Sequence, residues 1–558
     1  MSGRRAAPRR HEVRRAGVWL LAAMLALTAA AGAAAAAAAA TESLVFGSFR
    51  SEANARGWAQ TLDGRLDADF RVERVHRDDG VWWRVRTGPL TAEAMDALSS
   101  NARAQGLSIW VVRGTLERPS TITASTSAES IDPVPEPAAA GTRPPVAMAA
   151  ASRPARRAAA ADAGRDDGGM RSYTDFDLGL QSRAYRQRGL FGQSRFQPSF
   201  SARLEYQASW NDDRSTFKAV PFVRVDAEDD ERTHADLREF YYTRVGPDWE
   251  LHVGARQIFW GVTEFNHLVD IVNQTDLVED IDTEEKLGQP MVQLSLVRDW
   301  GIVDLFLLTG FRERTFPGDD GRLRLPVEVD TDDAWYASGA GRNRIDGAVR
   351  WSHHLGPLSL GIHHFSGTSR DPRFTPVADG GGVVLRPAYH VIDQTGIDAQ
   401  AIFGDWAWKL EALTRSGDGD RYHAVTAGFE RTLVGVLGTR SDLGVVVEYM
   451  YDQRDELAHN TLFEHDLAVG ARWRANDLAD TTALLGVIQD VRTDEYLVSL
   501  EASRRLGASW QMSLEARLFG GADPLPAGAP LPVLLDGRVK SRALQRDDYL
   551  QLELTRYF

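Results

Sequence analysis

The sequence predicts an all-β transmembrane barrel preceded by a small α+β domain. Three observations predict this fold: an export-type segment at the start of the chain, long stretches that alternate polar and apolar residues from residue 171 onward, and a final stretch of the same kind that ends on Phe558. We expect about 16–18 antiparallel strands, enough to enclose an aqueous channel. Their predicted starts lie near residues 171, 199, 215, 235, 249, 289, 301, 344, 358, 389, 405, 421, 441, 464, 480, 495, 508 and 546.

Residues 1–40 have the composition of a secretion signal. Several arginines precede an apolar stretch from Ala16 to Ala31, and small residues follow as far as Ala40. Signal peptidases cleave after such small residues, so we expect this segment to be removed, with an uncleaved membrane anchor as the alternative. No later run of about 18 apolar residues occurs, so we expect no transmembrane helix after it.

The remainder of the chain divides into three parts by composition. Residues 41–116 have a compact α/β pattern, residues 117–170 are rich in Ala, Pro, Ser and Thr and predict a flexible linker, and residues 171–558 form the expected barrel. The 558 residues include no cysteine, which excludes disulfides and thiolate metal sites. The net charge of −14 argues against nucleic acid as a partner.

The strand pattern favours a membrane barrel over a soluble β-sandwich. In lipid, every backbone N–H and C=O group must be paired within the protein, so barrel strands alternate lipid-facing apolar residues with lumen-facing polar ones. From Trp510 to Leu518 every second residue is apolar, and the residues between them are polar or charged. A sandwich also alternates, but it does not explain strands of about ten residues with charged inner faces. Tight turns such as Val245-Gly-Pro-Asp248, with longer connections at the other end, also indicate a barrel.

The end of the chain has the pattern of a barrel strand. Leu550, Leu552 and Leu554 alternate with polar residues before the terminal Phe558. This ending resembles the C-terminal signal of bacterial outer-membrane proteins, except that Arg556 occupies a position that is usually aromatic or apolar. An arginine near the lipid headgroups can extend its charge into water. The resemblance implies insertion into the outer membrane of a Gram-negative bacterium, with membrane lipid as a partner.

A long acidic segment between the fifth and sixth expected strands is the candidate pore constriction. Residues 261–288 would form the third external loop, which folds into the lumen in general porins. Apolar residues in the same segment support packing against the barrel wall. An acidic constriction would favour cations, whereas a solvated surface loop is the alternative. The candidate constriction residues are Glu264, Asp270, Asp276, Glu279 and Asp280.

The N-terminal part predicts the order strand, helix, strand, strand, helix, strand. Its first strand ends in Gly47-Ser48-Phe49, and a later strand follows the pattern aromatic-Arg-Val-x-x-Gly-Pro from Trp83 to Pro89. Both patterns resemble the signatures of SPOR domains, which are named after sporulation-related repeats. Such domains bind peptidoglycan glycan strands that lack stem peptides, and a spacer without this affinity is the alternative. The resemblance implies a sugar-binding surface at Ser48, Phe49, Arg84 and Arg86.

The sequence predicts no catalytic residue, metal or cofactor. The doublets His353-His354 and His363-His364 invite a metal site, but a turn at Gly356-Pro357 would pair residue 350 with residue 363. The doublets are then out of register by three residues, or roughly 10 Å. No nucleophile motif of the known hydrolases occurs, so we expect no enzyme.

Together these patterns predict a porin-like outer-membrane channel for small solutes, with cations favoured, tethered to peptidoglycan by its SPOR-like domain. Stretches near residues 260–276 and 311–317 also resemble segments of proteobacterial outer-membrane proteins of this porin-like type. Two alternatives remain: a structural anchor between outer membrane and peptidoglycan with a closed barrel, and a polysaccharide export channel.

Overall fold

The computed structural model describes the barrel over residues 170–379, 382–454, 463–526, 528–534 and 541–558. In the N-terminal part it describes four strands and single residues between them. The expected secretion signal and the expected linker up to residue 169 lie outside the described residues. The N-terminal part and the barrel form two compact units.

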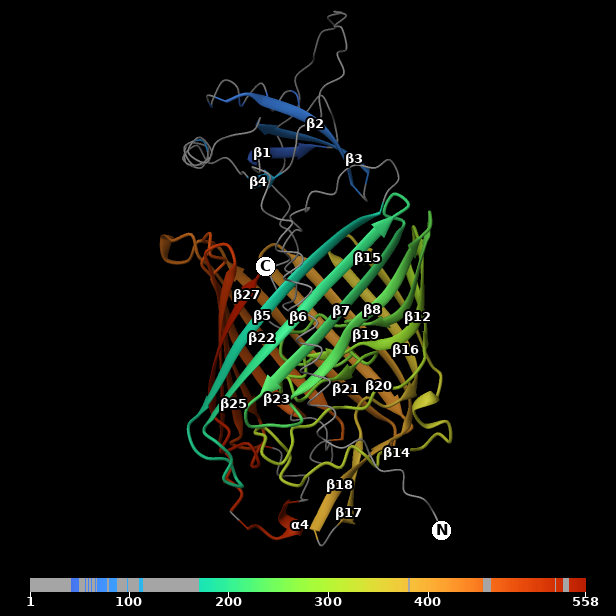
Figure 1. Ribbon diagram of the computed structural model, residues 1–558, viewed down its shortest axis with the longest axis vertical. Coiled ribbons are helices and arrows are strands. Elements are labelled where there is room, and N and C mark those ends of the chain that lie inside the picture. The colour runs from blue at the N-terminus through green and yellow to red at the C-terminus, as the bar shows by residue number, and fades with distance from the viewer. Residues whose placement is uncertain are drawn as a thin grey trace, which may run out of the picture. The chain divides into compact units, whose positions relative to one another are not determined.

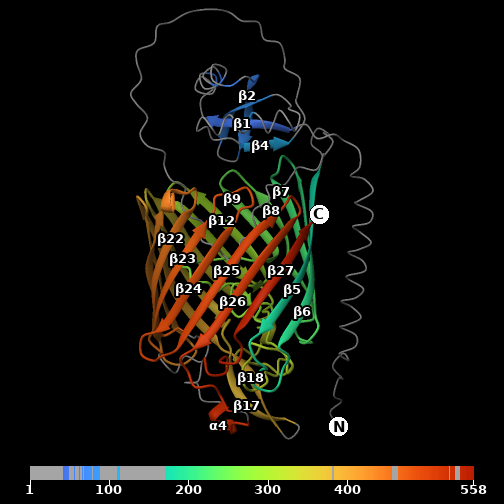
Figure 2. The same ribbon diagram turned by 90° about the vertical axis from the view of Figure 1, so that its left-hand side faces the viewer.

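The barrel is a closed ring of 18 antiparallel strands, which confirms the predicted fold class at the upper strand count (Figures 1 and 2). Neighbours in sequence are neighbours in the ring, and the last strand, β27 (Tyr549–Tyr557), pairs with the first, β5 (Arg171–Tyr185). The strands between them are β6 (Phe196–Trp210), β7 (Ser215–Asp226), β8 (His234–Val245), β9 (Trp249–Arg256), β12 (Gln289–Arg298), β13 (Gly301–Leu308), β15 (Asp346–Leu355), β16 (Leu358–Thr368), β19 (Val391–Phe403), β20 (Trp406–Ser416), β21 (Tyr422–Leu433), β22 (Asp442–Asp452), β23 (His465–Arg474), β24 (Thr482–Asp490), β25 (Tyr496–Leu506) and β26 (Trp510–Gly520).

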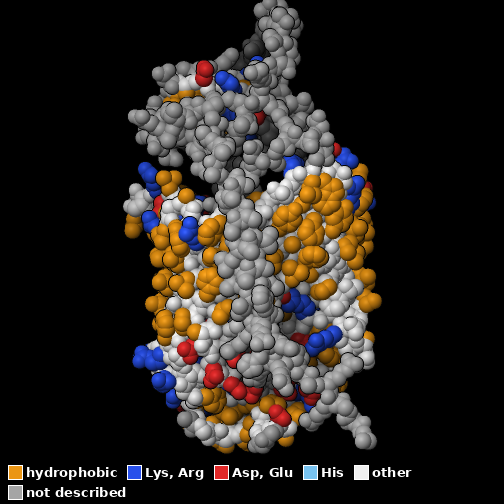
Figure 3. Space-filling model, in the orientation of Figure 1, with side chains coloured by type: hydrophobic (Ala, Val, Ile, Leu, Met, Phe, Trp, Pro, Cys, Tyr) orange, Lys and Arg blue, Asp and Glu red, His pale blue; other side chains and the backbone are white. Residues whose placement is uncertain are grey.

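The wall of the barrel is apolar outside and polar inside. In β13, Leu305 and Leu307 are 41% and 48% exposed, whereas Phe306 between them is 6% exposed and faces the interior. Figure 3 shows hydrophobic side chains over the wall and charged side chains mostly towards its two rims. Trp406 and Trp408 stack next to each other on the outer face, as aromatic residues do near the membrane interfaces. This surface fits a hydrocarbon layer.

Connections alternate between short turns at one end and long loops at the other. The turns Gly246–Asp248 and Gly356–Pro357 are at the short end, where Gly356 has a φ of 62° that favours glycine. The long loops include residues 257–288, 309–345 and 369–390. Outer-membrane barrels have short periplasmic turns, so the long loops face outward.

Short elements lie within the connections. In the loop 257–288, β10 (Gln274–Thr275) pairs with β11 (Lys286–Leu287). The external loops also contain a small sheet and a helix: β14 (Trp335–Tyr336), β17 (Arg373–Asp379), β18 (Gly382–Tyr389) and α4 (Leu531–Leu534), with 3-10 turns η1 (Gly341–Asn343) and, at the short-turn end, η2 (Val436–Gly438). Among the described residues, no helix is long and apolar enough to cross a membrane.

The N-terminal unit contains the four expected strands in one sheet. Its strands are β1 (Glu42–Phe49), β2 (Phe70–Arg77), β3 (Gly80–Thr87) and β4 (Trp110–Arg113), in the antiparallel order β2-β3-β1-β4. Leu44 and Val85 of the sheet form a core with Leu62 and Leu98, which belong to helical turns in the two predicted helix regions. Most other residues of those regions lie outside the described part of the chain.

Candidate functional site

The loop between β9 and β12, residues 257–288, lies inside the barrel and is called the inner loop (Figure 1). Its apolar residues Val269, Ile271 and Val272 are almost fully buried against Phe306 and Phe365, which point inward from the wall. The sequence predicted that these apolar residues would hold the segment against the wall. The inner loop is therefore part of the lumen rather than a solvated surface loop.

A carboxylate on the far wall holds the first half of the inner loop. One oxygen of Glu411 on β20 accepts hydrogen bonds from the backbone N–H groups of Val262 and Thr263, at 2.6 and 2.9 Å, and its second oxygen accepts one from Val269 at 3.1 Å. An ionised carboxylate only accepts hydrogen bonds, so it suits several donors at once. Because β20 lies five strands beyond β12 in the ring, the first half of the loop reaches well away from the two strands that it connects.

A second carboxylate holds the next two residues of the loop, and two glycines of the wall form a recess, the glycine socket, for the ring of the second one. Glu448 on β22 accepts hydrogen bonds from the backbone N–H groups of Glu264 at 2.7 Å and Phe265 at 3.0 Å. The ring of Phe265 lies over Gly470 and Gly486, which face each other on β23 and β24. A Cβ atom at either glycine would come within 2.6 Å of the ring, so the socket exists because both residues lack a side chain.

All five predicted constriction residues lie in the inner loop, and each forms an ion pair with a basic side chain. Four of them pair with arginines of the wall: Asp276 with Arg238 at 2.5 Å, Glu279 with Arg224 at 2.8 Å, Asp280 with Arg183 at 2.7 Å, and Glu264 with Arg472 of β23. Asp270 pairs with Lys286 of the loop itself at 3.3 Å.

These ion pairs fix the loop in place and neutralise much of its negative charge. Burial by itself would raise the pKa of Glu279, but Arg224, His234 and Arg238 together hold it well below its ordinary value. The carboxylate therefore stays ionised although it is buried, because its basic partners compensate for the loss of hydration. Sequence reasoning identified the acidic residues but missed their arginine partners, which lie on distant strands.

Other carboxylates of the lumen have neutral partners. Within the described residues, Asp304 and Glu553 accept hydrogen bonds from glutamine and hydroxyl side chains and form no ion pair, and Glu411 and Glu448 bind only neutral donors of the loop. In the described part of the chain, these four wall carboxylates therefore form hydrogen bonds with neutral groups and no ion pair.

Histidine, a common metal ligand, occurs in one cluster of the lumen and in the two doublets of β15 and β16. His234, Asp276 and Glu279 place ligand atoms within 4.8 Å of one another, but Arg238 and Arg224 already neutralise the two carboxylates. A cation there would face two guanidinium groups.

The histidine doublets of β15 and β16 are in the predicted register. Arg350 pairs with His363, and His353 pairs with Leu360, so the two doublets are displaced along the strands. His363 is buried next to Trp260 in the lumen, whereas His364 is exposed on the outer face. The register therefore keeps the two doublets apart.

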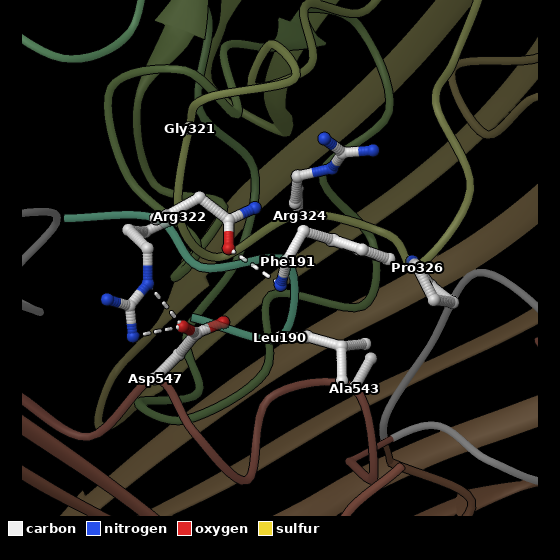
Figure 4. A pocket seen from close by; sticks show the side chains of 9 residues that line it. Leu190, Phe191, Gly321, Arg322, Arg324, Pro326, Ala543 and Asp547 are labelled. Carbon is white, nitrogen blue, oxygen red and sulfur yellow. Dashed lines mark hydrogen bonds and ion pairs between the residues drawn. The ribbon is translucent and has the colours of Figure 1, made fainter. Parts of the chain in front are cut away.

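The outer mouth is tied together by Arg322, which sequence reasoning did not identify (Figure 4). Its guanidinium donates hydrogen bonds to Asp547 at 2.7 Å and to the backbone carbonyls of Gln187 and Ser194 at 3.2 and 2.7 Å. It also lies 3.9 Å from the centre of the Tyr185 ring. One buried arginine therefore joins three long external loops next to the small pocket lined by Phe191 and Arg324.

The sugar-binding candidates of the N-terminal unit come together on two neighbouring strands. Ser48 of β1 lies directly opposite Arg84 of β3, and Phe49 lies opposite Trp83. Arg86 is buried and forms an ion pair with Glu73 of β2 at 3.3 Å. Arg86 therefore stabilises the sheet, while Arg84 is half-buried.

These features define a class: a closed transmembrane β-barrel of the outer-membrane type, preceded by a small N-terminal domain. Residues 43–113 match the family model of the SPOR domain. No curated protein sequence matches the chain.

Solved structures of other barrels are similar to this chain. OccD3 (OpdP) of Pseudomonas aeruginosa is 10% identical with a TM-score of 0.41, and the match covers 72% of this chain and 93% of that one. OpdQ of the same organism is 11% identical with a TM-score of 0.39, covering 70% and 97%. The outer-membrane expressed OmpT of Vibrio cholerae is 8% identical with a TM-score of 0.33, covering 71% and 99%.

Proposed function

We propose that the barrel is a porin-like channel for small solutes and that the SPOR domain tethers it to peptidoglycan. The observation that carries the proposal is the inner loop, which crosses a polar lumen and is fixed to both sides of it. A loop that is held at both sides narrows the passage for solutes. In this proposal, residues 1–40 direct export, residues 41–116 bind the cell wall, residues 117–170 link the domains and residues 171–558 form the channel.

The proposed channel favours cations. Glu264, Asp270, Asp276, Glu279 and Asp280 form the constriction and keep it in place through their ion pairs. The selectivity comes from the wall carboxylates that have no basic partner. Negative charge in a narrow lumen with a low-dielectric wall raises the local concentration of cations. The mechanism is passive diffusion, which needs neither a catalytic residue nor a cofactor.

Planar-bilayer recording of the purified full-length protein tests this function. Ohmic openings are expected, with a reversal potential in a salt gradient that indicates cation preference. Absence of conductance would reject the channel. It would favour the second candidate, a structural anchor with a closed barrel. The many hydrogen bonds that hold the inner loop in the lumen also support this candidate.

The proposed peptidoglycan surface includes Ser48, Phe49 and Arg84, whereas the fourth candidate, Arg86, is buried and supports the sheet through its ion pair with Glu73. The family match over residues 43–113 supports it, as does the position of Ser48 opposite Arg84. Arginine planes suit the hydroxyl groups of sugars. Full-length protein should be retained on sacculi stripped of stem peptides, and Arg84→Ala should lose retention, whereas the control Arg113→Ala on β4 should keep it. Equal retention of both variants would exclude this surface.

A further inference from the structure

We propose that His267 and Glu284 form a proton-operated latch that closes the inner loop on itself and loosens it when His267 loses its proton. The latch regulates the constriction of the proposed channel, so its role in conductance rests on that function. Its effect on the loop can be measured without any conductance.

The two residues join the two halves of the inner loop. His267 precedes the β10–β11 hairpin and Glu284 lies within its turn, and the His267 Nε2 atom is 3.7 Å from a carboxylate oxygen of Glu284. The side chains are only 9% and 15% exposed, so water screens the pair weakly. The ring of Phe259 meets the imidazole edge-on at a centroid distance of 4.9 Å and holds it in place.

Acidic groups surround the latch. His267 faces Glu284 and Asp270 of the loop and Glu411 of β20, with Lys286 paired to Asp270. Glu284 in turn faces Glu264 of the loop and Glu501 of β25. An imidazolium in this place is attracted by several carboxylates, whereas a neutral imidazole leaves Glu284 among like charges.

The direction of the pH effect follows from this surrounding charge. Burial by itself would lower the pKa of His267, but Glu284, Glu411 and Asp270 outweigh it and raise the pKa above the ordinary histidine value. A raised pKa means that the closed loop binds the proton more tightly than the open loop. The latch is therefore complete below the ordinary pKa and is lost as the pH rises through the raised one.

A single introduced thiol can report the state of the loop, because the chain has no cysteine. Leu268 is next to His267 and packs against Leu413 and Tyr422 of the wall. In the full-length protein, the maleimide labelling rate of Leu268→Cys would be measured from about pH 5 to about pH 10, a range that includes histidine titration. Dividing by the rate of Asp320→Cys, on an exposed external loop, removes the pH dependence of the thiol itself.

The normalised labelling rate should rise with pH by about tenfold for each unit by which closure raises the pKa. His267→Gln should give a high rate that does not change with pH, and His267→Lys, which keeps the charge, should hold the loop closed at alkaline pH. The control His353→Gln, at a residue of β15 outside the loop, should retain the wild-type profile.

A pH-independent rate in the wild type, or an unchanged profile in His267→Gln, would overturn the latch. If His267→Gln does not fold, Glu284→Gln tests the same pair and should also abolish the pH dependence. Silent bilayers with pH-dependent labelling would reject the channel and keep the latch. Conducting bilayers with pH-independent labelling would reject the latch and keep the channel.

Discussion

The attachment of the inner loop can be tested by adding one methyl group to the glycine socket that receives the ring of Phe265. In Gly486→Ala, the new Cβ atom would lie 2.5 Å from the Phe265 ring, closer than van der Waals contact allows. The ring has little room to turn away, because it packs against the buried side chains of Met450 and Ile488. The substitution should therefore expel the ring from its contacts with Met450 and Ile488.

The expected loss is the burial energy of most of one phenylalanine side chain, about 2 kcal/mol. It corresponds to roughly a thirtyfold larger fraction of detached loop. Trypsin cleavage after Lys286, followed by mass spectrometry on the folded barrel, measures that fraction. Gly347→Ala on β15 is the matched control, because the nearest atom to its Cβ is 3.8 Å away. If Gly486→Ala and Gly347→Ala are cleaved at the wild-type rate, the socket does not hold the loop.

Three further predictions concern charge. Arg472→Gln leaves the buried Glu264 without its closest cation and should cost about 3 kcal/mol; an unchanged unfolding temperature on heat-shift gels would contradict this. Replacing Asp304 and Glu553 by their amides should move the reversal potential towards zero, since it removes unbalanced negative charge; a constant reversal potential would locate selectivity elsewhere. Arg322→Ala should speed proteolysis of the external loops without changing the heat-shift behaviour of the barrel, because only the mouth loses its bonds.

The alternating pattern predicted the strands well, because the lipid and the lumen impose it on each strand separately. Differences arose where local signals mislead. The strand β6 begins at Phe196 instead of near residue 199, because Pro198 suggests a break but is tolerated close to a strand end. Pro221 is accommodated in β7 by a shift of the pairing register with β8.

The structure places the acidic loop inside the barrel, as the sequence predicted, but the ion pairs of the loop were not predicted. The count of strands placed the acidic loop third, and its apolar residues indicated that it packs inside. Its partners depend on how the barrel closes, which local sequence does not reveal. Arg472, for example, lies more than 200 residues after Glu264, and nothing in either segment indicates that they meet. The same holds for Glu411, whose value as an acceptor appears only when the loop crosses to β20.

The pairing of β27 with β5 has a consequence for assembly. Asp177 lies opposite Tyr557, so the seam joins the two ends of the barrel segment. Until β27 is in place, the backbone groups of β5 and β26 that face the seam have no strand partner, and hydrocarbon offers them none. The barrel is therefore complete in lipid only when this seam is paired, and a chain without it would present two unpaired strand edges to its neighbours.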